Sequence, residues 1–285
     1  MLNYIVWDVN PEIFNIGSFS VRWYGLLFAL GFLIGQRIIL HIFRKEGLPE
    51  DWVDSLTLYM VLATVIGARV GHYIFYEYPM FFANPWRWFK DMLLPPYAGL
   101  ASHGAAIGIF TGLYLFARAK KIHFFWITDR IVITVALAGC FIRLGNLMNS
   151  EIVGKATSVP WAFIFVNNTE FSPVPRHPSQ LYEAISCFIL CIVLYLIWRR
   201  YKTNLPQGLT TGIFMVVVFT LRFVYEFYKE NQVTFEDQMT YNLGQLLSVP
   251  AVLFGLVGIF WAIRRHETSI FLNSAPQSVR QNESK

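Results

Sequence analysis

The sequence predicts an all-α integral membrane protein with about seven transmembrane helices and a small periplasmic subdomain. Hydrophobic residues make up 55% of its 285 residues and charged residues only 14%, so the chain is too apolar for a water-soluble globule. Apolar stretches of about 18 or more residues recur along the whole length, and each can cross a bilayer. A polar stretch over 149–178 is punctuated by prolines and is long enough to form the subdomain.

Seven apolar segments account for the predicted spans, and the pattern of charge orients them. The first segment has no basic stretch before it and no small-residue cleavage site, so it is expected to stay in the membrane. Basic clusters follow every odd-numbered segment, such as Arg44 and Lys45 after the first and Arg264 and Arg265 after the last. The positive-inside rule therefore predicts a periplasmic N-terminus and a cytoplasmic C-terminus. The predicted spans are residues 20–42, 55–77, 98–117, 125–148, 179–198, 209–228 and 243–263.

The segments outside the spans differ in composition. Residues 78–97 combine prolines with Trp86 and Trp88, which favours a segment lying on the membrane surface. Residues 267–285 are polar and are expected to form a disordered cytoplasmic tail. The spans and their connections are expected to form one domain over residues 1–266.

Composition also argues against two classes of function. The net charge of +5 does not indicate nucleic-acid binding, because most lysines and arginines flank predicted helix ends. The three cysteines, Cys140, Cys187 and Cys191, lie in apolar spans and lack metal-ligand spacing with a histidine. We therefore expect neither a nucleic-acid partner nor a metal site.

Ionisable side chains inside the spans gather toward one membrane face. Each costs about 3 kcal/mol to insert, so such residues indicate function. The predicted topology places Arg143 and Arg222 near the outer ends of their spans and His103 about one turn below that face. Together they predict a positively charged cavity that opens to the outer leaflet and binds an anion such as phosphate. The other polar side chains expected near this face are Tyr24, Arg69, Asn146, Glu151, His177 and Glu226.

Other interpretations remain open for these residues. Arg222 and Glu226 are four residues apart and would neutralise each other on a helix, and Arg69 would reach the interface by extending its side chain. A transporter would place polar residues in both halves of several spans, whereas the cytoplasmic halves here look apolar. A headgroup transferase would show paired aspartates or His-Asp metal motifs, which the sequence lacks.

The run from Arg143 to Gly154, RLGNLMNSEIVG, resembles the signature of prolipoprotein diacylglyceryl transferases, which begin bacterial lipoprotein maturation. Similar matches cover nearly the whole chain: RWYGL at 22–26, GARVG at 67–71, SHG at 102–104, RHPSQLYE at 176–183, and Arg222 with Glu226. The sequence departs from the family pattern at Ala105, Ile142, Leu147 and Val218.

The resemblance implies transfer of the sn-1,2-diacylglyceryl group from phosphatidylglycerol to the lipobox cysteine thiol of a preprolipoprotein signal peptide, with release of glycerol 1-phosphate. It implies no cofactor and a location in the bacterial inner membrane. It implies catalytic roles for His103, Arg143 and Arg222, with His103 either deprotonating the thiol or binding substrate. The residues expected to contact the substrates are Tyr24, Arg69, Asn146, Glu151, Gly154, His177 and Glu226.

Overall fold

The computed structural model describes residues 4–17, 19–94, 99, 101–230, 239–265, 268 and 270. The chain divides into two compact units, so the single domain predicted over 1–266 comprises both. The first unit contains the described residues of 1–42 and 129–268, and the second contains those of 43–128 and 269–285. The predicted tail, 267–285, lies outside the described residues apart from 268 and 270.

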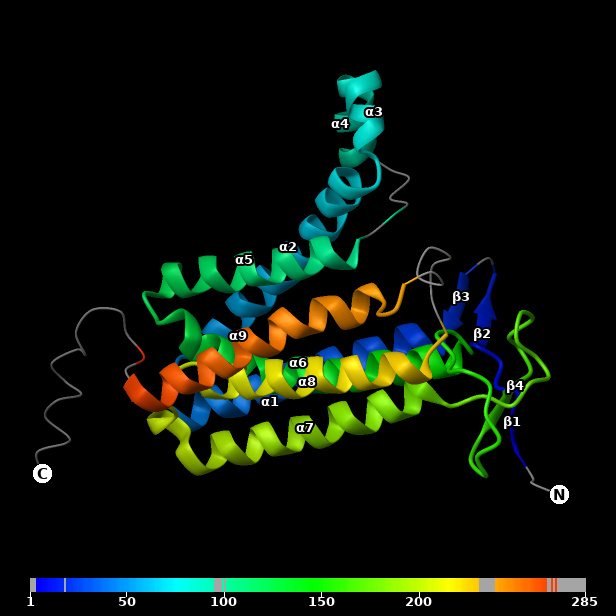
Figure 1. Ribbon diagram of the computed structural model, residues 1–285. Helices are drawn as coiled ribbons and strands as arrows, with labels where there is room; N and C mark the ends of the chain where they lie inside the picture. Colours follow the sequence, from blue (N-terminus) through cyan, green and yellow to red (C-terminus); the bar gives the residue numbers. More distant parts are fainter. Residues whose placement is uncertain are drawn as a thin grey trace, which may run out of the picture. The chain divides into compact units, whose positions relative to one another are not determined.

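Long helices run side by side through the first unit (Figure 1). Their outward faces carry exposed Leu, Ile, Val and Phe side chains, as expected where lipid replaces water as the solvent. Two one-turn 3-10 helices continue long helices: Lys202–Asn204 follows the helix that ends at Tyr201, and Glu226–Tyr228 follows the helix that ends at Tyr225. The long helices are α1 (Trp23–Lys45), α6 (Phe124–Met148), α7 (Ser179–Tyr201), α8 (Leu209–Tyr225) and α9 (Leu243–Arg265).

Glycines let α8 and α9 approach closely. A Cβ atom added to Gly212 of α8 would lie 2.9 Å from the backbone oxygen of Gly255 on α9, and the reverse distance is also 2.9 Å. Small residues at such a crossing allow backbone-to-backbone packing, which drives helix association in lipid. This contact holds the C-terminal helix against the helix that carries Arg222.

Short strands gather at one end of the first unit, which we call the strand end (Figure 1). Strand β1 (Ile5–Trp7) pairs in parallel with β4 (Phe163–Phe165), and β2 (Glu12–Ile16) pairs antiparallel with β3 (Phe19–Arg22). The Trp7 indole donates to the Leu147 carbonyl oxygen at 3.0 Å and covers a small buried apolar cluster. The subdomain expected from residues 149–178 therefore includes the N-terminal segment as well.

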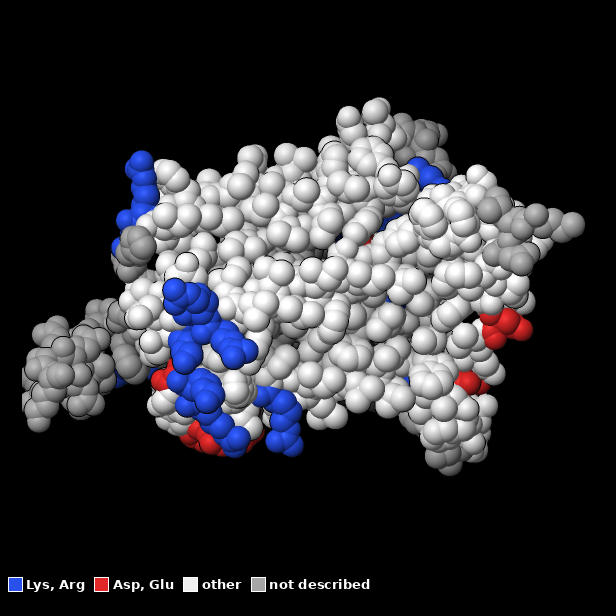
Figure 2. Space-filling model, turned by 90° about the horizontal axis from the view of Figure 1, so that it is seen from below, with Lys and Arg blue, Asp and Glu red and all other residues white. Residues whose placement is uncertain are grey.

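The opposite end of the first unit is basic. Arg199 and Arg200 occupy the last turn of α7, and Arg264 and Arg265 occupy that of α9. Figure 2 shows basic side chains gathered at the end where α7 finishes, beside a broad uncharged surface. We call this the basic end. An uncharged band flanked by a basic rim is the surface expected of a membrane-embedded protein.

The second unit is built on a tight pair of helices, α2 (Asp51–Phe75) and α5 (Ser102–Lys120). A Cβ atom added to Gly104 of α5 would lie only 2.2 Å from the backbone oxygen of Gly67 on α2, so the helices touch through their backbones. The segment predicted to lie on the membrane surface forms two short helices, α3 (Tyr78–Ala83) and α4 (Pro85–Leu93).

The mostly helical, multi-span architecture is confirmed. Among the described residues, six helices are long and apolar enough to cross a membrane: α1, α2, α6, α7, α8 and α9. The predicted third span corresponds to α5, a helix of 19 residues that is not among these six. Its crossing of the membrane stays a prediction.

Candidate functional site

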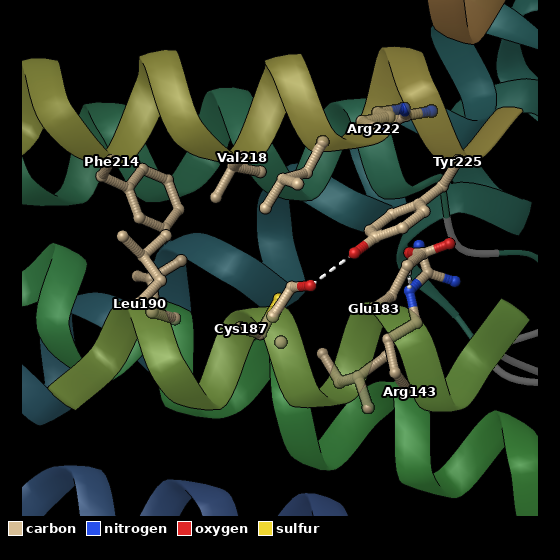
Figure 3. Close-up of a pocket in the computed structure, with 14 residues that line it drawn as sticks. Arg143, Glu183, Cys187, Leu190, Phe214, Val218, Arg222 and Tyr225 are labelled. Carbon is tan, nitrogen blue, oxygen red and sulfur yellow. Dashed lines mark hydrogen bonds and ion pairs between the residues drawn. The ribbon is translucent and has the colours of Figure 1, made fainter. Parts of the chain in front are cut away.

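A cavity of about 270 Å³ lies between α6, α7 and α8 of the first unit. Arg143, Glu183 and Arg222 line its end nearest the strands, whereas Leu190 and Phe214 line its other end (Figure 3). The cavity is therefore amphipathic along its length. Such a lining matches a molecule with an anionic group at one end and a hydrocarbon chain at the other.

Charged side chains form a continuous chain at the polar end of the cavity. Arg143 Nε lies 2.6 Å from Glu183 Oε2, and Lys229 Nζ pairs with the other oxygen of Glu183. The same ammonium lies 3.5 Å from Glu226 Oε1, which is 3.9 Å from Arg222 Nε. The order is therefore Arg143, Glu183, Lys229, Glu226, Arg222, with positive and negative groups alternating. Arg143, Glu183 and Arg222 come from α6, α7 and α8, Glu226 begins the following 3-10 helix, and Lys229 is the residue directly after that helix.

The members of this chain differ in their access to solvent. The Lys229 side chain is 2% exposed and that of Glu226 is 9% exposed, whereas that of Arg222 is 50% exposed. The middle of the charged chain is thus shielded from water, and its Arg222 end is open to solvent. An arginine that is open on one side and paired loosely on the other retains N–H donors for a ligand.

Asn146 links Arg143 to a third carboxylate. Its amide oxygen accepts from Arg143 Nη1 at 3.4 Å, and its amide nitrogen donates to Glu151 Oε1 at 2.7 Å. Glu151 also accepts from Asn149 at 3.3 Å. Because Arg143 and Asn146 are three residues apart on α6, they share one face of the helix.

The ring of Tyr24 lies against α6 beside these residues. A Cβ atom added to Gly145 would be 2.7 Å from a ring carbon of Tyr24, so only glycine admits the ring at this distance. The first helix therefore packs its predicted site residue against the turn that carries Arg143 and Asn146.

Gly154 and His177 occupy the strand end of the first unit. A Cβ atom added to Gly154 would lie 2.4 Å from the His177 oxygen and 2.8 Å from that of Tyr228, so any side chain would force these backbones apart. His177 Nδ1 lies 3.1 Å from the Tyr182 hydroxyl, which accepts from the Trp161 indole at 2.8 Å. Burial lowers the pKa of His177 below its ordinary value. Their contact with substrate stays a prediction.

His103 and Arg69 belong to the second unit. His103 is exposed on the first turn of α5, next to the glycine that packs on α2. Arg69 donates to backbone oxygens at the end of α4, those of Asp91 at 2.5 Å and Met92 at 3.0 Å. These bonds fasten α4 to α2, which is a structural task. The participation of His103 and Arg69 in the site stays a prediction.

Sequence reasoning placed Glu183 near the outer face and in a family-like motif but did not assign it to the site, and it did not assign Lys229 either. Glu183 is a carboxylate inside a predicted span, and that alone marks a functional candidate. Lys229 is three residues from Glu226, a spacing that brings side chains together on a helix. Nothing in the sequence indicated that one ammonium would join the two glutamates.

The prediction that the cytoplasmic halves of the spans are apolar is wrong for α6. Asp129 and Arg130 lie in the second turn of this helix, and both are completely buried. The Asp129 carboxylate accepts from the backbone nitrogens of Gly208 at 2.6 Å and Thr211 at 2.9 Å. It thereby caps the N-terminus of α8, where backbone N–H groups have no partner within the helix. This polar cluster is a tertiary helix cap and does not extend a path across the membrane.

The described residues contain no group of three or more His, Cys, Asp or Glu side chains arranged to hold a metal ion.

Comparisons with known proteins identify the family of this chain. A family model described as prolipoprotein diacylglyceryl transferase matches residues 11–261. The phosphatidylglycerol–prolipoprotein diacylglyceryl transferase of Bacteroides fragilis is 40% identical over 269 residues, which cover 90% of this chain and 95% of that protein. The enzymes of the same name from Chloroherpeton thalassium and Tolumonas auensis are 40% identical over 264 residues and 41% identical over 254 residues. They match 92% and 89% of this chain and 96% and 95% of their own lengths.

The matched region contains every helix that lines the cavity and every member of the charged chain described above. This multi-span membrane protein is therefore a transferase and belongs to the prolipoprotein diacylglyceryl transferase family.

Proposed function

We propose that this chain transfers the sn-1,2-diacylglyceryl group of phosphatidylglycerol to the thiol of the lipobox cysteine in a preprolipoprotein. The observation that carries the proposal is the cavity between α6, α7 and α8, with arginines at one end and an apolar lining at the other. A lipid phosphate fits the arginine end and an acyl chain fits the apolar end. The relatives' names, which specify phosphatidylglycerol and prolipoprotein, support the same substrates.

The reaction forms one bond and breaks one bond. The cysteine sulfur attacks the phosphate-bearing carbon of the diacylated glycerol unit. The bond between that carbon and the phosphate oxygen breaks, and glycerol 1-phosphate leaves with the bonding electrons. The thiol must first lose its proton, because the thiolate is the nucleophile. His103 is the proposed base, because a ring nitrogen of imidazole can accept the thiol proton. In the alternative, the arginines lower the pKa of the substrate thiol and His103 binds substrate.

Arg143 and Arg222 stabilise the leaving phosphate in this proposal. Negative charge grows on the phosphate as the carbon–oxygen bond breaks, and preorganised guanidinium groups stabilise that charge in a site shielded from water. Asn146 adds an amide for the phosphate or glycerol oxygens, and Tyr24 adds a hydroxyl. Glu226 lies beside Arg222 at 3.9 Å and adds negative charge there, and Glu151 accepts from the Asn146 amide and so orients it.

The proposal also includes Gly154, His177 and Arg69. Gly154 and His177 would shape the surface at which the signal peptide approaches, and Arg69 would meet the lipid near α4. The proposed location is the bacterial inner membrane, with the N-terminus and the strand end in the periplasm. The basic last turns of α1, α7 and α9 support this orientation through the positive-inside rule.

The test combines the purified protein with phosphatidylglycerol and a synthetic peptide that contains a lipobox cysteine. We expect the peptide to gain the mass of a diacylglyceryl group and an equal amount of glycerol phosphate to appear. A peptide with serine in place of the cysteine should gain nothing. Wild-type protein that forms neither product from the cysteine peptide would contradict the proposed function.

A further inference from the structure

We infer that Lys229 is a positioning residue that neutralises Glu183 and Glu226 and so keeps Arg143 and Arg222 available for the lipid phosphate. The inference rests on the proposed function. It assigns a role to a residue that the cavity lining does not include. Lys229 therefore acts through the two glutamates and not by touching the ligand.

The first support is the place of Lys229 in the charged chain. Its ammonium contacts Glu183, which holds Arg143, and Glu226, which lies beside Arg222. Among the five described residues of the charged chain, only Lys229 contacts both glutamates. It therefore joins the Arg143–Glu183 pair to the Glu226–Arg222 pair. With a side chain 2% exposed, it has lost nearly all of its hydration, and the carboxylates must replace it.

The second support is the occupation of the Glu226 carboxylate. Its Oε1 lies 3.5 Å from the ammonium of Lys229, and its Oε2 accepts from the Asn242 amide at 2.9 Å. Both oxygens are therefore engaged before Arg222 is considered. Arg222 Nε stays 3.9 Å from Oε1, beyond normal hydrogen-bond distance. Lys229 thus takes the position from which Glu226 would otherwise hold Arg222 in a close, bidentate pair.

The third support is charge. The five residues of the charged chain comprise three cations and two carboxylates, so the formal charge of this group is +1. Without the ammonium the formal charge is zero, with each arginine facing one carboxylate. Carboxylate–guanidinium pairing would then compete with the lipid phosphate for the same N–H donors. Because the interior is dry, this competition is screened much less than at a surface.

The backbone around Lys229 is built to place this side chain. Gly154 forms an antiparallel bridge with Lys229, and the Lys155 nitrogen donates to the Tyr228 oxygen at 2.8 Å. The segment that carries Gly154 therefore fixes the backbone from which the ammonium enters the interior. This gives the close packing at Gly154 a purpose within the first unit.

The test compares Lys229→Met, Lys229→Gln and Lys229→Arg by measuring kcat and KM for phosphatidylglycerol in the peptide assay. We expect the Met and Gln variants to raise KM by about tenfold, the scale of one lost charge coupling. The Arg variant keeps the charge and should stay near wild type. Lys155→Met is the matched control, because Lys155 is an exposed lysine four residues after Glu151 whose backbone nitrogen donates to Tyr228, the residue before Lys229.

A second-site variant separates positioning from direct contact. Lys229→Met combined with Glu226→Gln restores the formal charge of +1 and should recover most of the lost affinity for phosphatidylglycerol. A double variant no better than Lys229→Met would overturn the inference, as would wild-type KM in both Met and Gln variants. If Lys229→Met fails to accumulate in membranes, Lys229→Gln decides, since it keeps hydrogen-bond donors without the charge. A wild-type protein inactive on phosphatidylglycerol would instead overturn the proposed function.

Discussion

Buried charge occurs near both ends of α6, but the two clusters are built differently. At the basic end, Asp129 is completely buried and its carboxylate is surrounded by donors from one helix terminus: Gly208 N, Thr210 Oγ1, Thr211 N and Thr211 Oγ1. At the strand end, Arg143 is paired with a carboxylate on one side and lines a cavity on the other. The first cluster is closed on itself, and the second is open to a ligand.

We propose that this difference separates a structural ion, Asp129, from a functional one, Arg143. A buried carboxylate bound by backbone and hydroxyl donors stabilises the fold and leaves nothing for chemistry. A buried cation that borders an amphipathic cavity keeps donor capacity for charge that arrives with a substrate. Burial and charge alone therefore do not identify the site, because both clusters have them.

The largest effect is expected at the open cluster. Arg143→Ala should lower kcat/KM for transfer by about 10²–10³, the loss typical of removing one donor to a developing anion. The amount of protein in the membrane should stay near wild type, because the cavity side of Arg143 contributes little packing. Arg87→Ala, at a surface arginine paired with Asp91, is the control and should leave kcat/KM unchanged. Full activity of Arg143→Ala would contradict a functional role for Arg143 in the open cluster.

The closed cluster should give the opposite result. Asp129→Ala removes the carboxylate that accepts from the Gly208 and Thr211 backbone nitrogens, so we expect a loss of about 3 kcal/mol in stability. Thermal unfolding in detergent should show a lower Tm, while KM of the surviving protein stays near wild type. Asp91→Ala, at a partly exposed aspartate, should change stability by less than about 0.5 kcal/mol. An Asp129→Ala variant with unchanged Tm and reduced transfer would invert the comparison.

A smaller effect is expected at the apolar end of the cavity. Val218 lines the cavity on α8, so Val218→Trp would place a ring in the space assigned to an acyl chain. We expect KM for phosphatidylglycerol to rise by about tenfold, since overpacking costs 1–3 kcal/mol. Val257→Trp, at an exposed position of α9, tests whether any added ring has this effect. Equal kinetics for the two variants would show that the apolar end is not occupied by lipid.

The smallest effect concerns pH and the strand end. Burial lowers the pKa of His177, so the unfolded chain takes up a proton before the folded one as pH falls through about 6.5. The contribution of His177 to stability is therefore lost on the acid side of that value. Thermal unfolding between pH 7.5 and 5.5 should show a slightly weaker pH dependence in His177→Gln than in wild type. A stronger dependence in the variant would mean that the folded state favours the protonated ring.

The sequence predicted the parts of this molecule that follow from local pattern. Each predicted span corresponds to a helix, and the ends of the two differ by only a few residues. Apolar length and flanking charge determine where such a helix begins and ends. The sequence predicted that polar side chains of six spans gather at one membrane face, since their depth follows from the direction of each span; the predicted set includes Tyr24, Arg69, His103, Arg143, Asn146, Glu151, His177, Arg222 and Glu226. That prediction required no knowledge of which helices are neighbours.

What escaped prediction depends on contacts between distant segments. Asp129 caps a helix only because α8 begins beside it, and Gly208, which donates to its carboxylate, lies 79 residues away in the sequence. Lys229 became part of the site through Glu183, a residue on another helix. The strand β1 is too short to predict from its own residues, since its partner lies in β4. Such pairings leave little trace in local composition.

The parallel pairing of β1 with β4 also affects biogenesis. Residue 5 is aligned with residue 163, so the N-terminal strand emerges first and must wait, unpaired, while more than half of the chain is synthesised. Closing so long a loop delays this contact relative to the local helices. Strand β1 therefore pairs later than the helices that form between the two strands, and a bulky insertion directly before Ile5 would interfere with maturation of the whole strand end.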